Sequence, residues 1–323
     1  DLSLTIPSER AVGLVGESGS GKSLTLRAIL GLLPDGVQAV AGSITYGERC
    51  IEVSDVSSLQ KMGGRKISMI FQDSSSSLNP VLRVRDQITD SLRLVGGQSK
   101  REAENGCMNL LADMGFEDPT SVAQKYPSEL SGGMRQRIGI AAAIALSPSL
   151  ILCDEPTTAL DVITQRQIWM LIRSLCSKHH TSLLYVSHDL SVVANICDSV
   201  SVMKAGKLVE SGNLSDIFRH PQEKYTRALI EAVPRIPKQW RQTPEQTEPL
   251  LQVHELTKVY GAGYSPRKNP GTEVLHGVSF DVPFHRIVGL IGGSGSGKST
   301  VARIVSGLEL PSAGSLRFAG DEL

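Results

Sequence analysis

The sequence predicts an α/β fold built around a parallel sheet. Short apolar runs that suit buried strands alternate with longer runs whose apolar residues recur every three or four positions, as helices require. The pattern G-x-x-x-x-G-K-S occurs twice, over 16–23 and 292–299, each time between an apolar run and a helical pattern. Strands separated by helices pair in parallel and bind ligands at their carboxyl ends, so we expect a ligand site there.

The first loop follows the apolar run Val12–Val15 and precedes a predicted helix over 24–33. Its glycines let the backbone turn tightly and point N–H groups at an anion, and the helix dipole adds to that field. Lys22 is predicted to reach the β- and γ-phosphates of a nucleotide, and the Ser23 hydroxyl to ligate Mg²⁺. The predicted nucleotide-binding residues are Gly16, Glu17, Ser18, Gly19, Ser20, Gly21, Lys22 and Ser23.

The second loop repeats the first with its flanks. Residues 11–23 and 287–299 agree at 10 of 13 positions, 276 residues apart, which argues against the alternative of a flexible Gly/Ser turn. We therefore predict two fused nucleotide-binding units with the same strand–loop–helix context, and Ser299 as a second Mg²⁺ ligand. The predicted nucleotide-binding residues here are Gly292, Gly293, Ser294, Gly295, Ser296, Gly297, Lys298, Ser299 and Thr300.

The remaining elements follow from periodicity. Further strands are predicted over 41–46, 66–71, 150–154, 181–186 and 200–203. Helices are predicted over 86–94, 102–114, 138–146 and 161–178, the last with Ile163, Ile168, Leu171, Ile172 and Leu175 on its apolar side. A new strand is expected to begin at Leu251.

The predicted organisation is a first domain over 1–233, with a helical subdomain over about 79–137, and then a linker. The stretch 234–250 is rich in Pro, Gln and charge and has no periodicity, as linkers do. Residues 251–323 repeat the beginning of the first domain and stop soon after the second loop, so we interpret both chain ends as cuts through a longer protein. An incomplete sheet exposes edges and apolar faces, so this second part is expected to be less stable than the first.

Composition excludes several classes of protein. Lys plus Arg equals Asp plus Glu at 33 each, so no basic excess indicates a nucleic-acid partner. No apolar run approaches the roughly 20 residues that span a bilayer, so we expect any membrane role to be peripheral. The five cysteines are scattered and lack metal-site spacing, which favours reduced thiols.

Polar side chains follow three of the predicted strands. Asp154 and Glu155 close one strand, where the first carboxylate is predicted to hold Mg²⁺ and the second to polarise an attacking water. Gln72 follows another strand and is predicted to touch Mg²⁺ or water. His188 ends a third and is placed to hydrogen-bond the γ-phosphate. A solvated acidic pair and a structural histidine are the alternatives, and the shared strand-end location weighs against both.

A second anion site is predicted before the helix over 138–146. Ser131 can cap that helix, and Gly132 and Gly133 expose backbone N–H groups at its N-terminus. Two anion sites in one domain make sense if two such domains face each other across a nucleotide. The predicted residues of this site are Ser131, Gly132, Gly133, Met134 and Arg135.

The order of these features resembles ATP-binding cassette (ABC) ATPases over essentially the whole chain. The resemblance implies a P-loop NTPase fold, ATP and Mg²⁺ as ligands, and an ATPase activity coupled to transport. Gln72, Ser131–Gly133 and Asp154 would be the Q-loop, signature and Walker B aspartate. By the same resemblance, Glu155 would be the general base, Asp161 (after Ala159-Leu160) the D-loop aspartate and His188 the switch histidine. Tyr260 in the second copy looks like the aromatic residue that stacks on adenine.

Finer details resemble one subfamily, the dipeptide, oligopeptide and nickel importers. The stretch 71–80 (FQDSSSSLNP) is similar to their FQDP-x-x-SLNP, with Ser74 in place of Pro, and Met134 fits a variant signature. The resemblance implies permease subunits and, through them, a solute-binding protein as partners, at the cytoplasmic face of the inner (plasma) membrane. Peptides, nickel, glutathione and metallophores all remain open as the solute. The subfamily's cysteine-containing motif is missing from 234–250, so no iron–sulfur cluster is expected.

The alternative from another class is a soluble ABC ATPase of DNA repair or translation. Neutral charge, the lack of zinc-type cysteine pairs and the Ser-Leu-Asn-Pro stretch weigh against it. In the resembled family, ATP lies between the loop of one domain and the signature of the other, within one chain or between two. Because the second domain lacks its later motifs, we expect this chain to bind nucleotide at the first loop without being complete for hydrolysis.

Overall fold

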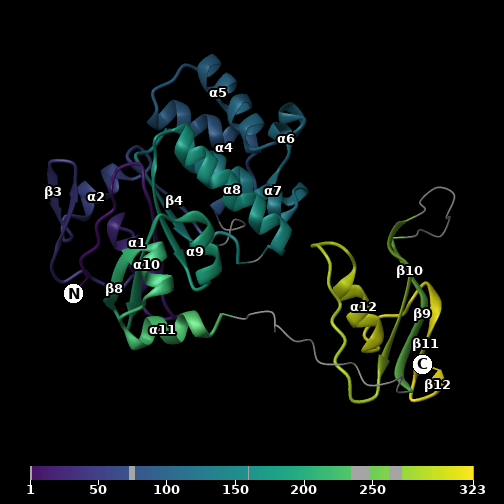
Figure 1. Cartoon of the computed structure of the whole chain (residues 1–323). Coiled ribbons are helices and arrows are strands. Elements are labelled where there is room, and N and C mark those ends of the chain that lie inside the picture. Colours follow the sequence, from purple (N-terminus) through teal and green to yellow (C-terminus); the bar gives the residue numbers. More distant parts are fainter. Residues whose placement is uncertain (1, 73–76, 159, 234–247, 262–270, 323) are drawn as a thin grey trace. The chain divides into compact units, whose positions relative to one another are not determined.

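A computed structural model describes residues 2–72, 77–158, 160–233, 248–261 and 271–322. The chain divides into two compact units, residues 1–235 and 236–323 (Figure 1). Most of the predicted linker, and Ala159 of the predicted D-loop, lie outside the described residues. The proposed domain boundaries therefore stay predictions, and each unit is described by itself.

The first unit is built on a six-stranded sheet of order β4-β5-β6-β1-β7-β8. The strands from β4 to β7 run parallel, as predicted, and the edge strand β8 is antiparallel to β7. The central strand β1 lies between β6 and β7. The bounds are β1 Ala11–Val15, β4 Ile67–Ile70, β5 Leu150–Asp154, β6 Ser182–Ser187, β7 Ser199–Lys204 and β8 Lys207–Asn213.

Both faces of this sheet are buried. Alternate residues of β5 and β6 point to opposite faces, so Leu152 and Leu184 belong to one buried cluster while Ile151 and Leu183 belong to another. Helix α1 (Lys22–Ile29) packs into the first cluster. The second cluster is larger and holds α7 (Gly132–Ile144), α8 (Val162–Lys178) and α9 (Leu190–Ile196). A sheet covered on both faces holds its strand ends rigidly, which is what a strand-end site needs.

Residues 84–144 form a helical group, in the range where the helical subdomain was predicted, and it lies at the top of the first unit in Figure 1. Within it, α4, α5 and α6 pack on one another, and α7 contacts both β4 and α8. Its other elements are α4 Val84–Asp90, the π-helix η1 Ser91–Val95, α5 Lys100–Asp113, α6 Pro119–Gln124 and the 3₁₀-helix η2 Pro127–Glu129.

The remaining elements of the first unit lie around the sheet. A small hairpin, not fully predicted, pairs β2 with β3. These elements are β2 Ser43–Tyr46, β3 Arg49–Glu52, α2 Val56–Met62, α10 Leu214–Arg219 and α11 Lys224–Glu231. No helix among the described residues is both long and apolar enough to cross a membrane.

Side-chain caps fix where the functional helices begin. Ser131 accepts a hydrogen bond from Met134 N–H and so starts α7 several residues before the predicted 138–146, which places both signature glycines in its first turn. Asp161 accepts from Thr164 N–H and starts α8 as predicted. One prediction on α8 is wrong: Ile163 is 67% exposed, because it lies in the first turn, before the helix meets the core.

The second unit has a different, antiparallel sheet of order β10-β9-β11-β12. Its helix α12 packs Val301 and Ile304 against Val253 and Leu275 of this sheet. The strand expected from Leu251 is confirmed as part of β9. The elements are β9 Pro249–Tyr260, β10 Thr272–Pro283, α12 Lys298–Val305, β11 Ala313–Phe318 and β12 Asp321–Glu322.

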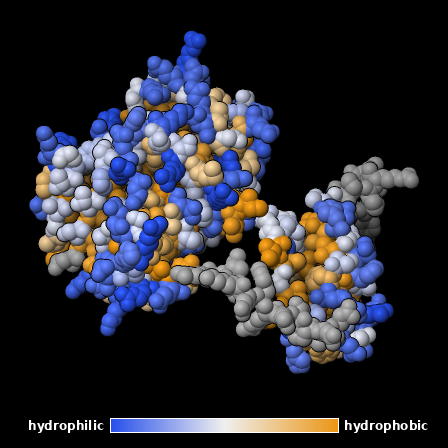
Figure 2. Space-filling model, viewed as in Figure 1, coloured by the Kyte–Doolittle hydropathy of each residue, from blue (hydrophilic) through white to orange (hydrophobic). Residues whose placement is uncertain are grey.

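The predicted strand before the second loop is wrong. Residues 287–291 repeat the sequence of β1, yet the structure assigns them no strand, and Ile287 and Ile291 are 102% and 93% exposed. Their counterparts in β1 are buried because β6 and β7 pair with that strand on both sides. Within the described part of the second unit, no strand pairs with 287–291. Apolar residues accordingly gather on the visible surface of this unit (Figure 2).

Candidate active site

The first phosphate loop joins β1 to α1. Gly19 and Gly21 have φ of 81° and 101°, a region that glycine enters without steric cost. Gly21 is the N-cap of α1, so the helix N-terminus opens directly onto the loop. At Gly16, a Cβ atom would overlap the carbonyl oxygen of Met203 on β7, so the loop also needs glycine where it leaves the sheet.

Lys22 bends back over its own loop. Its Nζ donates to the carbonyl oxygens of Gly16, at 2.7 Å, and Glu17, at 2.9 Å. The residue is 5% exposed. Burial lowers the pKa of Lys22 from its ordinary value, while the carboxylates of Glu155 and Asp154 oppose that shift. The ammonium is therefore held inside the loop, near the two carboxylates at the end of β5.

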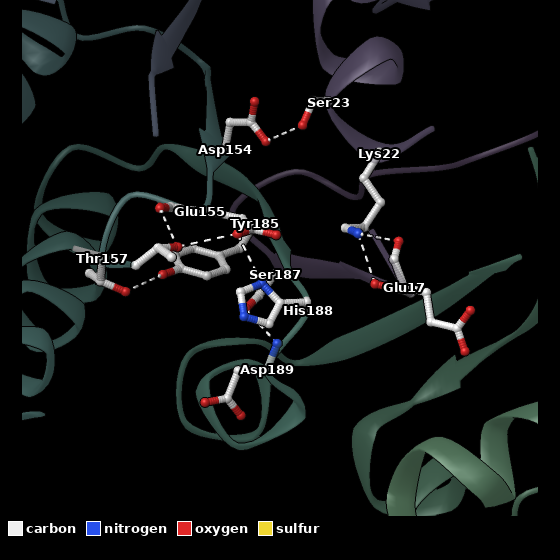
Figure 3. A network of polar contacts seen from close by, with 12 residues as sticks. Glu17, Lys22, Ser23, Asp154, Glu155, Thr157, Tyr185, Ser187, His188 and Asp189 are labelled. Carbon is white, nitrogen blue, oxygen red and sulfur yellow. Dashed lines mark hydrogen bonds and ion pairs between the residues drawn. The ribbon is translucent and has the colours of Figure 1, made fainter. Parts of the chain in front are cut away.

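Ser23, in the first turn of α1, and Asp154, at the carboxyl end of β5, come together. The Ser23 hydroxyl donates to Asp154 Oδ1 at 2.7 Å, although 131 residues separate them (Figure 3). Burial raises the pKa of Asp154, and Glu155 adds to this, while the bond from Ser23 and the charges of Arg27 and Lys22 oppose it. A buried carboxylate that carries such a cost suits a nearby cation.

This pair fits Mg²⁺. A hydroxyl and a carboxylate are the oxygen ligands that the ion prefers, and Mg²⁺ at phosphate sites takes one or two carboxylates with waters and phosphate oxygens. Among the described residues, no group of three or more His, Cys, Asp or Glu is placed to hold a metal by itself. Ser23 and Asp154 therefore match an ion that is bound together with a nucleotide.

Glu155 and His188 form a second pair beside the first. His188 Nδ1 lies 2.9 Å from Glu155 Oε2, and the two residues follow β5 and β6 (Figure 3). The Glu155 side chain is 14% exposed and that of His188 55%, so the carboxylate is sheltered and the imidazole faces solvent. Thr158 Oγ1 also donates to Glu155 Oε2, at 3.2 Å. The arrangement holds one carboxylate oxygen and leaves the other for a further ligand.

The backbone of Glu155 is strained. Its φ is 44°, in the left-handed region that side chains other than Gly, Asn and Asp rarely enter. Its N–H donates to Val186 O on β6 at 3.1 Å. The following turn is fixed by Thr157, whose hydroxyl accepts from Trp169 Nε1 at 3.1 Å and contacts the hydroxyl of buried Tyr185 at 3.4 Å. This network keeps the carboxylate of Glu155 in place against the strain.

Gln72, the predicted signature residues and Asp161 lie at the ends of other elements of the first unit. Gln72 is exposed and follows β4, the strand that pairs with β5. The signature residues begin α7, where Arg135 Nη1 donates to Leu130 O at 2.7 Å and holds the turn before Ser131. Asp161 Oδ2 accepts from the Thr164 hydroxyl at 2.9 Å. Each lies on a defined helix or strand end, and their roles stay predictions.

The second loop keeps the local shape of the first. Lys298 Nζ donates to Gly292 O and Gly293 O, at 2.7 and 2.6 Å, and Gly297 caps α12 with φ of 88°. The loop conformation is therefore set by its own sequence and not by the strand before it. Thr300 is buried in α12, at 9% exposure.

Tyr260 is the last residue of β9 and is 37% exposed. Its hydroxyl donates to Glu309 Oε2 at 2.8 Å, and the ammonium of Lys258 lies 5.1 Å from its ring centroid. These contacts orient the ring, and its predicted stacking on adenine stays a prediction.

One contact at the first loop was missed by sequence reasoning. The hydroxyl of Tyr225 on α11 accepts a hydrogen bond from Glu17 N–H at 3.1 Å. The two residues are 208 positions apart, and neither spacing nor composition links them. The strand order, in which β7 pairs with β1 and β8 pairs with β7, brings α11 near the loop.

Residues 1–158 and 275–323, together more than half of the sequence, match the ABC transporter family. The chain belongs to the ABC transporter family. Residues 209–272 also match a family described as the C-terminal region of oligopeptide/dipeptide transporters.

Relatives of known function are also ATP-binding proteins of transport systems. The peptidoglycan transport ATP-binding protein YejF of Agrobacterium fabrum is 37% identical over 324 residues, which is 98% of this chain and 58% of the relative. The glutathione import ATP-binding protein GsiA of Salmonella typhimurium is 35% identical over 355 residues, covering 100% of this chain and 57% of the relative. The chain thus spans less than three-fifths of the length of these relatives. They give no support to the DNA-repair alternative.

Solved structures confirm the fold. A dimeric post-hydrolysis state of the ATP-binding cassette MJ0796 bound to ADP and Pi superposes with a TM-score of 0.57 at 29% identity, over 66% of this chain and 89% of that chain. The cassette cbiO1 from Clostridium perfringens, at 24% identity and the same TM-score, supports the fold alone. The predicted ABC ATPase fold is confirmed, whereas the prediction that residues 251–323 begin a second copy stays a prediction.

Proposed function

We propose that this ABC protein is the ATP-binding and ATP-hydrolysing part of an importer for peptides or a related small solute. The observation that carries the proposal is that residues of α1 and of the ends of β5 and β6 meet at one edge of the sheet. There, Lys22 and Ser23 of the phosphate loop lie with Asp154, Glu155 and His188, joined by the contacts Ser23–Asp154 and Glu155–His188.

Each residue then has a task that its position suits. Lys22 exchanges the carbonyls of Gly16 and Glu17 for the β- and γ-phosphate oxygens of ATP, because charged phosphate is the stronger acceptor. Glu155, sheltered and held on one oxygen, accepts a proton from the attacking water. His188 is exposed enough to turn toward the γ-phosphate while it orients the glutamate.

Ser23 and Asp154 are the residues that would hold Mg²⁺, with Gln72 as a further oxygen ligand and Ser299 in the same role at the second loop. When bound, the ion neutralises charge on the phosphates and fixes their geometry. The Ser23 hydroxyl, which donates to Asp154 in this structure, would offer its oxygen to the ion with its proton turned away from Asp154.

The proposed partners follow from the named relatives. YejF and GsiA are transport and import ATP-binding proteins, and we place this chain likewise beside permease subunits that receive solute from a binding protein. The site would be at the cytoplasmic face of the membrane, without nucleic acid. The signature at the start of α7 would complete a nucleotide site on a facing ABC domain, within the parent chain or between two chains.

Nucleotide binding tests one part of the proposal, and ATP turnover tests another. The purified chain is expected to bind MgATP, with Lys22→Ala in a Lys298→Ala background removing binding and Lys298→Ala alone leaving one site. Steady turnover is not expected, because a facing domain with its own base and signature is needed. Cooperative ATP turnover by residues 1–323, abolished by Glu155→Gln, would contradict this part.

The importer itself is tested by purification from membranes. A tagged chain, extracted in mild detergent from its source cells, is expected to bring down a membrane permease. Recovery with ribosomes or DNA, and without a permease, would refute the importer assignment while leaving the ATPase assignment intact.

A further inference from the structure

Tyr225 ties the phosphate loop to a part of the chain that does not build it. The Tyr225 hydroxyl accepts the hydrogen bond from Glu17 N–H at 3.1 Å. Tyr225 lies in α11, inside residues 209–272, the segment that matches the C-terminal region of oligopeptide/dipeptide transporters. The second residue of the loop is thus fixed from outside the strand and helix that flank it.

The peptide groups of Glu17 are held on both sides. Its N–H is bonded to Tyr225, and its carbonyl oxygen is bonded to the ammonium of Lys22 at 2.9 Å. Nucleotide phosphate takes Lys22 away from that carbonyl. The bond to Tyr225 then restrains Glu17 on its N–H side, while the backbone bond from Ser20 N–H to Glu17 O, at 3.2 Å, stays on the carbonyl side.

Helix α11 is itself firmly placed. The carboxylate of Glu210 on β8 accepts from Gln222 N–H at 2.8 Å and from Glu223 N–H at 3.2 Å, immediately before the helix. The ammonium of Lys204, at the end of β7, lies 4.6 Å from the centroid of the Tyr225 ring. Both contacts come from the β7–β8 hairpin, so the hairpin sets where the tyrosine hydroxyl lies.

The same hairpin also contacts the loop directly. Gly206 N–H, in the turn between β7 and β8, donates to Ser20 O at 3.0 Å. The loop is therefore held at its second residue through Tyr225 and at its fifth through Gly206. A loop fixed in its binding shape loses less conformational freedom when the nucleotide arrives, which raises affinity without any contact to the ligand.

We propose that Tyr225 is a positioning residue for the first nucleotide site, and that its hydroxyl raises the affinity for nucleotide by fixing Glu17 of the phosphate loop. The proposal rests on the proposed function, in which this loop binds ATP. It gives the segment after β8 a part in nucleotide binding, in addition to whatever it does in transport.

The test measures MgATP affinity by titration calorimetry, with all variants in a Lys298→Ala background so that the first loop alone reports. Tyr225→Phe removes the hydroxyl and keeps the ring. We expect the dissociation constant to rise by roughly three- to tenfold, as the loss of one net hydrogen bond predicts. The matched control is Tyr46→Phe, which removes another tyrosine hydroxyl bond, to Ser149 Oγ, at a distant hairpin. It is expected to leave the affinity unchanged.

A second measurement follows the loop itself. Hydrogen exchange of the Glu17 amide in the nucleotide-free chain is expected to be faster in Tyr225→Phe than in Tyr46→Phe, at similar melting temperatures. A purely structural role for the tyrosine would lower the melting temperature and leave the affinity and this amide unchanged.

The outcomes separate two failures. If the Lys298→Ala chain binds MgATP and Tyr225→Phe binds it within twofold as well, the positioning role is overturned and the proposed function stands. If the Lys298→Ala chain does not bind MgATP at all, the proposed function fails, and the inference fails with it.

Discussion

Gly13 and Gly289 occupy equivalent positions in the similar stretches 11–23 and 287–299, and replacing each by alanine tests how different their surroundings are. In β1, a Cβ atom on Gly13 would overlap Val193 Cγ1 of α9 and come within 3.3 Å of Sγ of Cys197, the C-cap of that helix; both neighbours belong to the larger buried cluster. On Gly289, the same atom would meet no heavy atom within 4 Å. Neither glycine has a φ in the left-handed region, so packing alone should decide the outcome.

The expected magnitudes differ clearly. Forcing one extra carbon into a packed core costs about 1–3 kcal/mol. For a unit of this size, each kcal/mol lowers the melting temperature by roughly 2–4 °C, so Gly13→Ala should lower the first unit's transition by roughly 2–12 °C. Gly289→Ala meets no neighbour and restricts the unfolded chain, so its effect should lie between zero and about 1 kcal/mol of stabilisation.

Differential scanning calorimetry of the whole chain measures both variants, and hydrogen exchange assigns each transition to its unit. Amides of 11–15 are expected to be protected and those of 287–291 to exchange early. Equal destabilisation by Gly13→Ala and Gly289→Ala would refute the reasoning, because it would mean that 287–291 is packed as β1 is.

Three further results are expected. Ser23→Ala should weaken MgATP binding by roughly 10- to 100-fold, as the loss of a charged hydrogen-bond partner does. When EDTA removes the metal, the same substitution should change ATP affinity little. The matched control is Ser215→Ala, which breaks an exposed hydrogen bond to Asp216. Glu155→Gln should leave MgATP binding within about threefold of the parent while removing any turnover seen in a complete assembly, where general-base catalysis contributes roughly 10²–10⁴-fold. An alkylating reagent at pH 8 should label one thiol of the folded chain and five after unfolding, because Cys50 is the only exposed cysteine of the five. Burial also makes the other four thiols unreactive by raising their pKa. The pKa rises to about 11 for Cys107 and to about 12 for Cys176 and Cys197, and that of Cys153 is raised as well. Labelling of two or more thiols in the folded chain would contradict that burial.

The central strands were predictable because both faces of the sheet are covered. A strand buried on both sides reads as a continuous apolar run, and β1, β5 and β6 do so. The edge strand β8 was missed, since its sequence KLVESGN is half polar and its residues are only partly buried. Both Ser23 and Asp154 were predicted to bind Mg²⁺ at the carboxyl ends of the strands, and the structure places them in contact although 131 residues separate them.

The wrong predictions have one physical cause: the outcome depends on residues distant in the sequence, which a local sequence pattern does not include. Residues 287–291 have the sequence of β1, but strand formation there depends on partner strands. Ile163 has helical periodicity with the buried residues of α8, yet it lies in the first turn and faces solvent. Tyr225 reaches Glu17 only through the folded arrangement of β7, β8 and α11, so no signal in the sequence marked it.

The left-handed backbone of Glu155 has a consequence for engineering this protein. A glutamate at φ of 44° costs on the order of 1–3 kcal/mol, which glycine would not incur and asparagine would incur less. Any scheme that ranks substitutions by folding free energy alone would therefore favour Gly or Asn at this position. Such a variant would melt at a higher temperature and lack the carboxylate that faces His188. At this residue, thermostability and the proposed turnover oppose each other, and an assay of heat resistance would select against the proposed general base.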